Sequence, residues 1–180
     1  MAATVSVSVR GGETLLRHLE ELAEAKGLVK AGIMEGSRNY AEVIEYAPSQ
    51  EFGAQIEVTP KMRKFLAYNF DIHLRPDKTH IIIPPRPFMR TTFEEHWQEW
   101  VELLAGYLRS GVAPEIALEY VGIRMQDDII AKIKSNMPPP LSDATKKIKS
   151  MPEQSPENAD RTLYHSGQLA HSIDYEVIPE

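Results

Sequence analysis

Two histidines and two aspartates within residues 71–80 are the side chains whose types and spacing come closest to a reactive site. If this stretch forms a β-hairpin, His73 and His80 lie nearly opposite each other. Asp71 or Asp77 could then complete a metal site with imidazole and carboxylate ligands, as in a small metal-binding hydrolase. No His-x-x-x-His or His-Glu-x-x-His spacing accompanies them, and half-exposed histidines on a surface hairpin account for the same pattern. We therefore keep the hydrolase as an alternative hypothesis.

Other signatures of catalysis are absent from the sequence. The chain has no cysteine, which excludes disulfides, thiolate metal ligands and a cysteine nucleophile. It also has no glycine-rich phosphate loop and no Gly-x-Ser-x-Gly elbow. A formal net charge of −6 argues against general nucleic-acid binding. The sequence contains no run of 18 or more apolar residues, so it predicts no membrane span. We predict a protein that is not an enzyme and that holds neither a cofactor nor a metal.

A proline-rich corner at residues 79–90 links two elements in the middle of the chain. The β-branched run from Ile81 to Ile83 predicts a buried strand. Three prolines follow it and end the strand, because proline donates no ladder hydrogen bond and has a fixed φ. An amphipathic helix comes directly afterwards. The corner therefore presents Arg86, Phe88 and Arg90, which we expect to hold it against the core or against a neighbouring subunit.

Hydrophobic periodicity and turn residues predict the elements around this corner. Strands are predicted at residues 5–9, 28–34, 55–58, 70–74, 79–83 and 173–178, with 70–74 and 79–83 forming a hairpin. Helices are predicted at residues 13–26, 40–47, 61–69, 92–109, 114–137 and 142–149, with one further turn at 166–169. Thr59 and Pro60 suit the N-cap and first position of the third helix. Pro48 is expected to break the second helix and to leave a turn at residues 50–53.

The helix at residues 92–109 carries the strongest apolar stripe of the chain. Its members are Phe93, Trp97, Trp100, Val101, Leu104 and Leu108. We expect both tryptophans in the core, because each buries roughly 150–250 Å². Short loops around this helix favour an antiparallel helical layer with the next one. A further alternative is a regulatory or adaptor protein that dimerises through this tryptophan-containing helix.

The composition changes after residue 136, where prolines and polar residues become frequent. We predict an α+β core domain at residues 1–136, with a small antiparallel or mixed sheet packed against several helices. A proline-rich linker with a short helix follows at residues 137–162, and a C-terminal docking arm at residues 163–180. A terminal strand has unpaired edges, so it must pair with its own domain or with a neighbour. The residues expected to dock the arm are Leu163, Leu169, Ile173 and Tyr175.

Four short segments follow one another along the chain. They are Gln50-Glu51-Phe52-Gly53, the strand and Thr-Pro-Lys-Met-Arg run at 56–63, the Ile-Pro-Pro-Arg-Pro-Phe-Met-Arg corner at 83–90, and the Thr-Leu-Tyr-His-Ser-Gly-Gln-Leu element that runs on to Ser172-Ile173. Taken in this order, they resemble the virion-morphogenesis proteins of tailed bacteriophages, which are the tail-completion or neck proteins that join tail to head. In the last element His165 stands where aspartate is usual, and Ser166 stands where threonine is usual.

The resemblance implies a structural, non-enzymatic virion protein. It would form a homo-oligomeric ring of roughly six or twelve subunits at the neck, completing the tail and joining it to the head. Its partners would be portal-side head–tail connector proteins and the tail terminator or tail tube protein. DNA would pass through the lumen without specific recognition. The protein would be assembled in the host cytoplasm and reside in the virion, and a tail terminator or minor tail protein is the alternative within this class.

Overall fold

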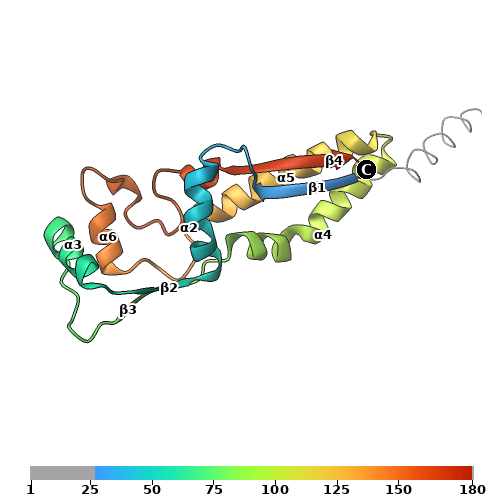
Figure 1. Cartoon of the computed structure of the whole chain (residues 1–180). Coiled ribbons are helices and arrows are strands. Elements are labelled where there is room, and N and C mark those ends of the chain that lie inside the picture. The colour runs from blue at the N-terminus through green and yellow to red at the C-terminus, as the bar shows by residue number, and fades with distance from the viewer. Residues whose placement is uncertain (1–26, 180) are drawn as a thin grey trace, which may run out of the picture.

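The computed structural model of this chain describes residues 27–179. The strand predicted at residues 5–9 and the helix predicted at residues 13–26 lie outside the described residues. The molecule is elongated, with residues 27–33, 88–134 and 173–179 at one end and residues 54–83 and 143–149 at the other (Figure 1). In chain order the elements are β1 (Gly27–Ile33), α2 (Tyr40–Phe52), β2 (Ala54–Glu57), α3 (Pro60–Phe70), β3 (His80–Ile83), α4 (Phe88–Arg109), α5 (Pro114–Lys134), α6 (Asp143–Lys149), a 3-10 turn (Pro156–Asn158), α7 (Gln168–His171) and β4 (Ile173–Pro179). This confirms the predicted α+β class.

The larger end of the molecule is built from strands that come from opposite ends of the described chain. β4 pairs antiparallel with β1, with Ile173 opposite Ile33 and Tyr175 opposite Ala31. Helix α5 covers one face of this pair and contacts both strands, and α4 packs against α5 (Figure 1). The ring of Tyr175 lies so close to Gly122 of α5 that a Cβ at that position would overlap it. The C-terminal strand therefore docks onto its own domain.

One apolar core lies where α2 and the C-terminal segment meet α4 and α5. Phe88, at the start of α4, is fully buried in it, as is Val43 of α2. The C-terminal segment contributes equally, because the side chains of Leu163, Leu169 and Ile173 are only 7%, 4% and 2% exposed. Residues 163–173 are thus part of the same core as α2, α4 and α5, rather than an appendage held away from it.

Helix α4 buries less of its apolar stripe than the sequence predicts. Trp100 is buried and donates its indole N–H to Asp128 Oδ2 of α5 at 2.8 Å. Phe93, Trp97 and Val101, spaced four residues apart, are instead 59%, 44% and 57% exposed. Among the elements within residues 27–179, only α5 makes extensive contact with α4, and it does not cover the opposite side of the stripe. The expectation that both tryptophans lie in the core therefore holds for Trp100 and is wrong for Trp97.

The predicted break at Pro48 is also wrong, because α2 continues through this proline to Phe52. Proline removes a single helical hydrogen bond, and Pro48 lies on the exposed side of the helix. Val43, Ala47 and Glu51 follow one another at four-residue spacing, and all three are buried. Burial along this face holds the helix together across the missing bond, so residues 50–52 are helical rather than a turn.

The hairpin predicted at residues 70–83 does not form. Helix α3 extends to Phe70 and ends at Asp71, whose φ of 50° is left-handed, and β3 pairs antiparallel with β2 instead. The guanidinium of Arg63 instead holds the loop between α3 and β3. It donates to the backbone carbonyls of Leu74, Arg75, Pro76 and Lys78. One arginine on α3 thus fixes the loop where the predicted turn was expected.

Candidate functional site at the proline corner

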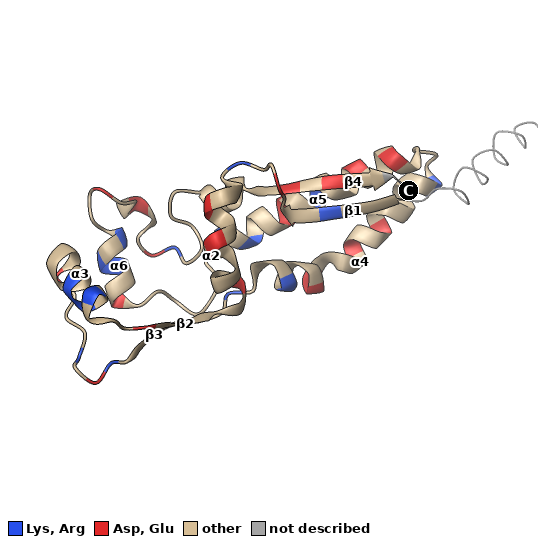
Figure 2. Cartoon of the chain, viewed as in Figure 1, with Lys and Arg blue, Asp and Glu red and all other residues tan. Residues whose placement is uncertain are grey.

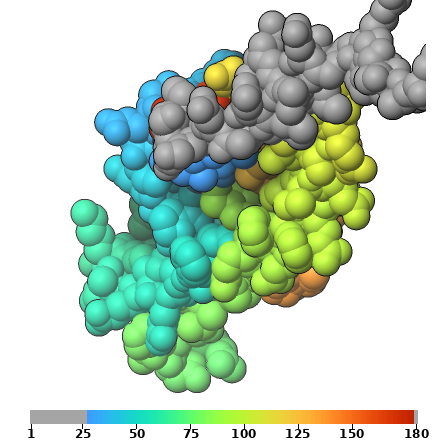
Figure 3. Space-filling view, turned by 90° about the vertical axis from the view of Figure 1, so that its right-hand side faces the viewer, coloured from blue at the N-terminus to red at the C-terminus, as the bar shows by residue number. Residues whose placement is uncertain are grey.

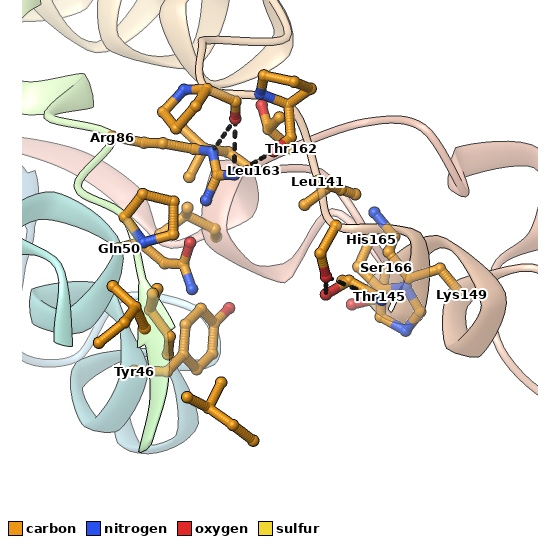
Figure 4. Close-up of a pocket in the computed structure, with 18 of the residues that line it drawn as sticks. Tyr46, Gln50, Arg86, Leu141, Thr145, Lys149, Thr162, Leu163, His165 and Ser166 are labelled. Atoms are coloured by element: carbon orange, nitrogen blue, oxygen red, sulfur yellow. Dashed lines mark hydrogen bonds between the residues drawn. The ribbon is translucent and has the colours of Figure 1, made fainter. Parts of the chain in front are cut away.

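Arg86 is the buried centre of the proline corner. Its side chain is 4% exposed, and its Nε and Nη2 atoms donate to the carbonyl of Pro139 at 2.9 and 2.7 Å (Figure 4). Its backbone N–H donates to the carbonyl of Gln50 at 2.7 Å. Burial lowers the pKa of Arg86, which is the expected effect of removing a cation from water. Arg86 thereby ties together three segments that are distant in sequence: α2, the corner and the proline-rich segment.

Glu51, at the end of α2, caps the helix that follows the corner. Helix α4 starts after Pro87, which offers no side-chain cap. The buried carboxylate of Glu51 accepts the backbone N–H groups of Met89 and Arg90 at 3.0 and 3.1 Å. It also accepts Nε of Arg90 at 3.2 Å. A negative charge at a helix N-terminus is favourable because it satisfies free N–H groups and complements the helix dipole.

The two residues after Glu51 fit the same junction. The guanidinium of Arg90 lies over the ring of Phe52, 5.0 Å from its centroid. Gly53 has a φ of 80°, and a Cβ there would stand 2.9 Å from the carbonyl oxygen of Ile83. Glycine is therefore required by both conformation and space. The Glu-Phe-Gly run and the proline corner form a single packed unit.

The C-terminal segment closes this junction from the other side. Lys149 of α6 is 8% exposed, and its Nζ donates to the carbonyls of Arg161 and Tyr164 at 2.6 and 2.9 Å. The turn before α7 is held by these bonds and by Gly167, whose φ is 82°. No side chain caps α7, so neither His165 nor Ser166 takes the capping role that the related motif suggests.

The structure brings six of the seven predicted interface residues to this junction. Phe88, Leu163, Leu169 and Ile173 lie in one buried cluster, while Arg86 and Arg90 bind the backbone and Glu51 around it. Tyr175 lies apart, on β4 beside Gly122. In the single chain these side chains stabilise the fold from within. Which residues contact a neighbouring subunit remains a prediction, and the exposed surfaces are the better candidates.

Sequence reasoning did not find the capping role of Glu51. Two signals could have indicated it. First, helix α4 begins directly after a proline, which has no side-chain acceptor to cap it. The first N–H groups of α4 therefore need an acceptor from elsewhere in the chain. In addition, Glu51 continues the buried four-residue spacing of Val43 and Ala47. A buried glutamate that ends one helix near the start of the next is a natural acceptor.

The residues proposed for a metal site do not assemble. His73 Nε2 lies 3.2 Å from Asp71 Oδ1 on an exposed loop, whereas His80 contacts Thr79 Oγ1 at 3.0 Å in β3. Within residues 27–179, no cluster of three or more histidine, aspartate or glutamate side chains could hold a metal ion. None of the helices in that range combines the length and apolarity needed to cross a membrane.

A pocket of about 810 Å³ lies beside the corner. Figure 4 shows Tyr46 and Gln50 of α2 on one side of it, with Lys149 and Thr145 of α6 and His165 of the C-terminal segment on the other. Comparisons of the chain with known protein families, curated proteins and solved structures gave no match.

Proposed function

We propose that this protein is a structural component of a tailed-phage virion that forms a homo-oligomeric ring at the neck, completing the tail and joining it to the head. Portal-side connector proteins and the tail terminator or tail tube protein are its proposed partners. Three of the four segments that carry the resemblance, at residues 50–53, 83–90 and 162–173, meet at the proline corner. Their convergence supports the proposal, because short motifs of one family are expected to pack together when the family shares a fold.

The observation that carries the proposal is the presence of two unlike exposed surfaces on one elongated chain. The first, the α3 surface, consists of Lys61, Lys64, Phe65 and Tyr68. Phe65 and Tyr68 are 55% and 91% exposed, and α3 contains no acidic residue. In Figure 2, ribbon positions coloured blue for lysine and arginine gather on α3 and the neighbouring α6.

The second, the α4 surface, consists of Phe93, Glu94, Trp97, Val101 and Glu102. Its three apolar members are those left exposed on α4, and its two glutamates form no ion pair with any described residue. In the space-filling view α4 forms an open flank of the molecule (Figure 3). In Figure 2, ribbon positions coloured red for aspartate and glutamate lie along α4, α5 and β4. This surface is therefore apolar and acidic, where the α3 surface is apolar and basic.

Two different surfaces that complement each other favour head-to-tail contact between copies. A heterologous contact of this kind generates a ring when its rotation closes. Here the α3 surface of one copy would bury its aromatic side chains against the α4 surface of the next. Lysines of the first would face glutamates of the second, which favours this orientation over α3 against α3 or α4 against α4.

Introduced cysteines test this contact cleanly, because the chain has none of its own. Asn69 is exposed beside Tyr68, and Gln98 is exposed beside Trp97, so Asn69→Cys and Gln98→Cys leave both surfaces intact. Under mild oxidation the double variant is expected to give a ladder of disulfide-linked oligomers on a non-reducing gel. Each single variant should stay monomeric. Glu45→Cys with Gln98→Cys is the matched control, since Glu45 is exposed on α2 away from both surfaces.

Two results would contradict the head-to-tail contact. A double variant that cross-links no more than the control would show that the α3 and α4 surfaces do not meet. A Gln98→Cys single variant that forms only dimers would indicate a two-fold contact of α4 with itself. The second result would favour the adaptor protein that dimerises through its tryptophan-containing helix.

A further inference from the structure

The pocket beside the corner contains buried cations without a carboxylate partner. Arg86 and Lys149 both line it, and both are bound only to backbone carbonyls. Nη1 of Arg86 forms no hydrogen bond with any residue in the described range. Asp160 attracts Lys149, but its carboxylate is paired with Lys146 Nζ at 2.9 Å. Burial lowers the pKa of Arg86 and of Lys149, as expected where a buried positive charge is not neutralised.

Thr162 also lines the pocket, and its hydroxyl is buried with no hydrogen-bond partner in the described part of the chain. Buried polar groups are nearly always paired in folded proteins, so an unpaired one needs an explanation. The two cations mark the pocket as a place where an anionic ligand would be stabilised.

One wall of the pocket is the free edge of a strand. Ile81, Ile82 and Ile83 of β3 all line it, whereas no residue of β2 does. Successive side chains of a strand point to opposite faces, so three consecutive residues line one cavity only along the edge of the strand. Among the described elements, β3 pairs with β2 alone. Its other edge therefore offers unpaired backbone groups to an added strand.

We propose that this pocket binds an extended acidic segment of a partner protein, which pairs with the free edge of β3 and places a carboxylate against Arg86. Backbone pairing along an exposed edge is a common mode of peptide recognition, in which pockets for alternate side chains give specificity. The isoleucines of β3 and Leu141, Leu163 and Leu169 supply apolar walls for the side chains between the acidic ones. This inference does not depend on the ring, because it concerns what a single chain binds.

The chemistry of the walls distinguishes this ligand from others. A phosphate-rich polymer needs an exposed basic surface with many cations, whereas here two cations lie among apolar side chains. A volume of about 810 Å³ lies at the upper part of the range for ligand pockets, roughly 300–1,000 Å³, and is large for a single small carboxylate. An acidic, apolar peptide matches both the charge and the size.

Capped synthetic peptides test the proposal on the full-length protein by calorimetry and NMR. A Val-Glu-Val-Glu-Val peptide is expected to bind and to shift the Nε–H resonance of Arg86. The neutral Val-Gln-Val-Gln-Val peptide should bind about tenfold more weakly, because a hydrogen bond to a charged group is stronger than one between neutral groups. A Val-Glu-Val-Glu-Val peptide methylated on alternate backbone nitrogens should not bind, because it cannot pair with β3.

A pocket-filling variant locates the binding without removing any hydrogen bond of the fold. Ser166 is exposed at the pocket wall, so Ser166→Trp should abolish peptide binding. Ser110→Trp, at the exposed C-terminal end of α4, is the matched control and should bind like the native protein.

Any of four results would overturn the proposal: no binding at millimolar peptide, equal binding of the glutamate and glutamine peptides, equal binding of the methylated peptide, or competition by glutarate at the same concentration as the peptide.

Discussion

Replacing Glu51 by glutamine tests whether this residue stabilises the proline corner as the structure indicates. Glutamine keeps the size and shape of the side chain but removes its charge. The carboxylate now accepts three hydrogen bonds, from two backbone N–H groups of α4 and from Nε of Arg90. In the variant, a neutral amide must accept hydrogen bonds from the same donors in the same buried position.

The expected loss follows from these contacts. A negative charge at a partly buried helix N-terminus contributes roughly 0.3–2 kcal/mol, and hydrogen bonds to a charged group exceed neutral ones by about 1 kcal/mol. The side chain of Arg90 is 55% exposed, so the guanidinium left behind is stabilised by water and adds little. We expect Glu51→Gln to lower the free energy of unfolding by about 2 kcal/mol, which corresponds to about 4–8 °C in Tm for a chain of this size.

Urea and thermal unfolding measure this loss, with Glu45→Gln as the control. Glu45 is exposed on the same helix and forms no hydrogen bond or ion pair with another residue of the range 27–179, so its replacement should change the free energy of unfolding by less than about 0.5 kcal/mol. If Glu51→Gln unfolds at the same urea concentration as Glu45→Gln, the carboxylate does not hold the start of α4. The account of the corner would then be wrong.

Three further predictions concern the same junction. Phe88→Ala should lower the free energy of unfolding by about 3–5 kcal/mol in urea, because it opens a cavity at a fully buried site; a loss below about 1 kcal/mol would contradict the assigned core. Gly53→Ala should destabilise by more than 1 kcal/mol, whereas Gly106→Ala, in α4 with open space around it, should stabilise by about 0.5–1 kcal/mol; equal effects in thermal unfolding would refute the role of the Gly53 turn. Burial lowers the pKa of Lys149, so the unfolded chain holds this proton more tightly, and the stability that it contributes rises with pH between the folded-state pKa and 10.5. Urea unfolding across that window should show the native protein gaining stability relative to Lys149→Arg, and parallel curves would contradict this.

Local signals were sufficient for much of the fold. Thr59 accepts the N–H of Met62 and Pro60 begins α3, as their residue types predict. The predicted strands at residues 28–34 and 173–178 correspond to β1 and β4, and each depends on a short apolar run. These features succeed because neighbours in sequence determine them.

The remaining features depend on contacts between distant residues. Arg63 donates to carbonyls of the loop that follows α3, and no pattern within residues 70–83 reveals this. The exposure of Trp97 depends on how many elements pack around α4. The hydrophobic periodicity of the helix does not contain that information. In the sequence, Glu51 looks like an ordinary acidic residue of a helix. Its capping role becomes visible only in the structure, where the start of α4 lies beside it. Hydrophobic patterns thus predicted most of the helices and strands, but not which elements pack or pair with one another.

The proposed ring is tested most directly by the mass of the purified full-length protein in light scattering, measured alone and after mixing with a tail or connector fraction of a tailed phage. The account predicts a ring of roughly six or twelve subunits, either from the protein alone or when the virion fraction is added. A protein that stays monomeric or dimeric at all concentrations, with no change on addition of that fraction, would contradict it.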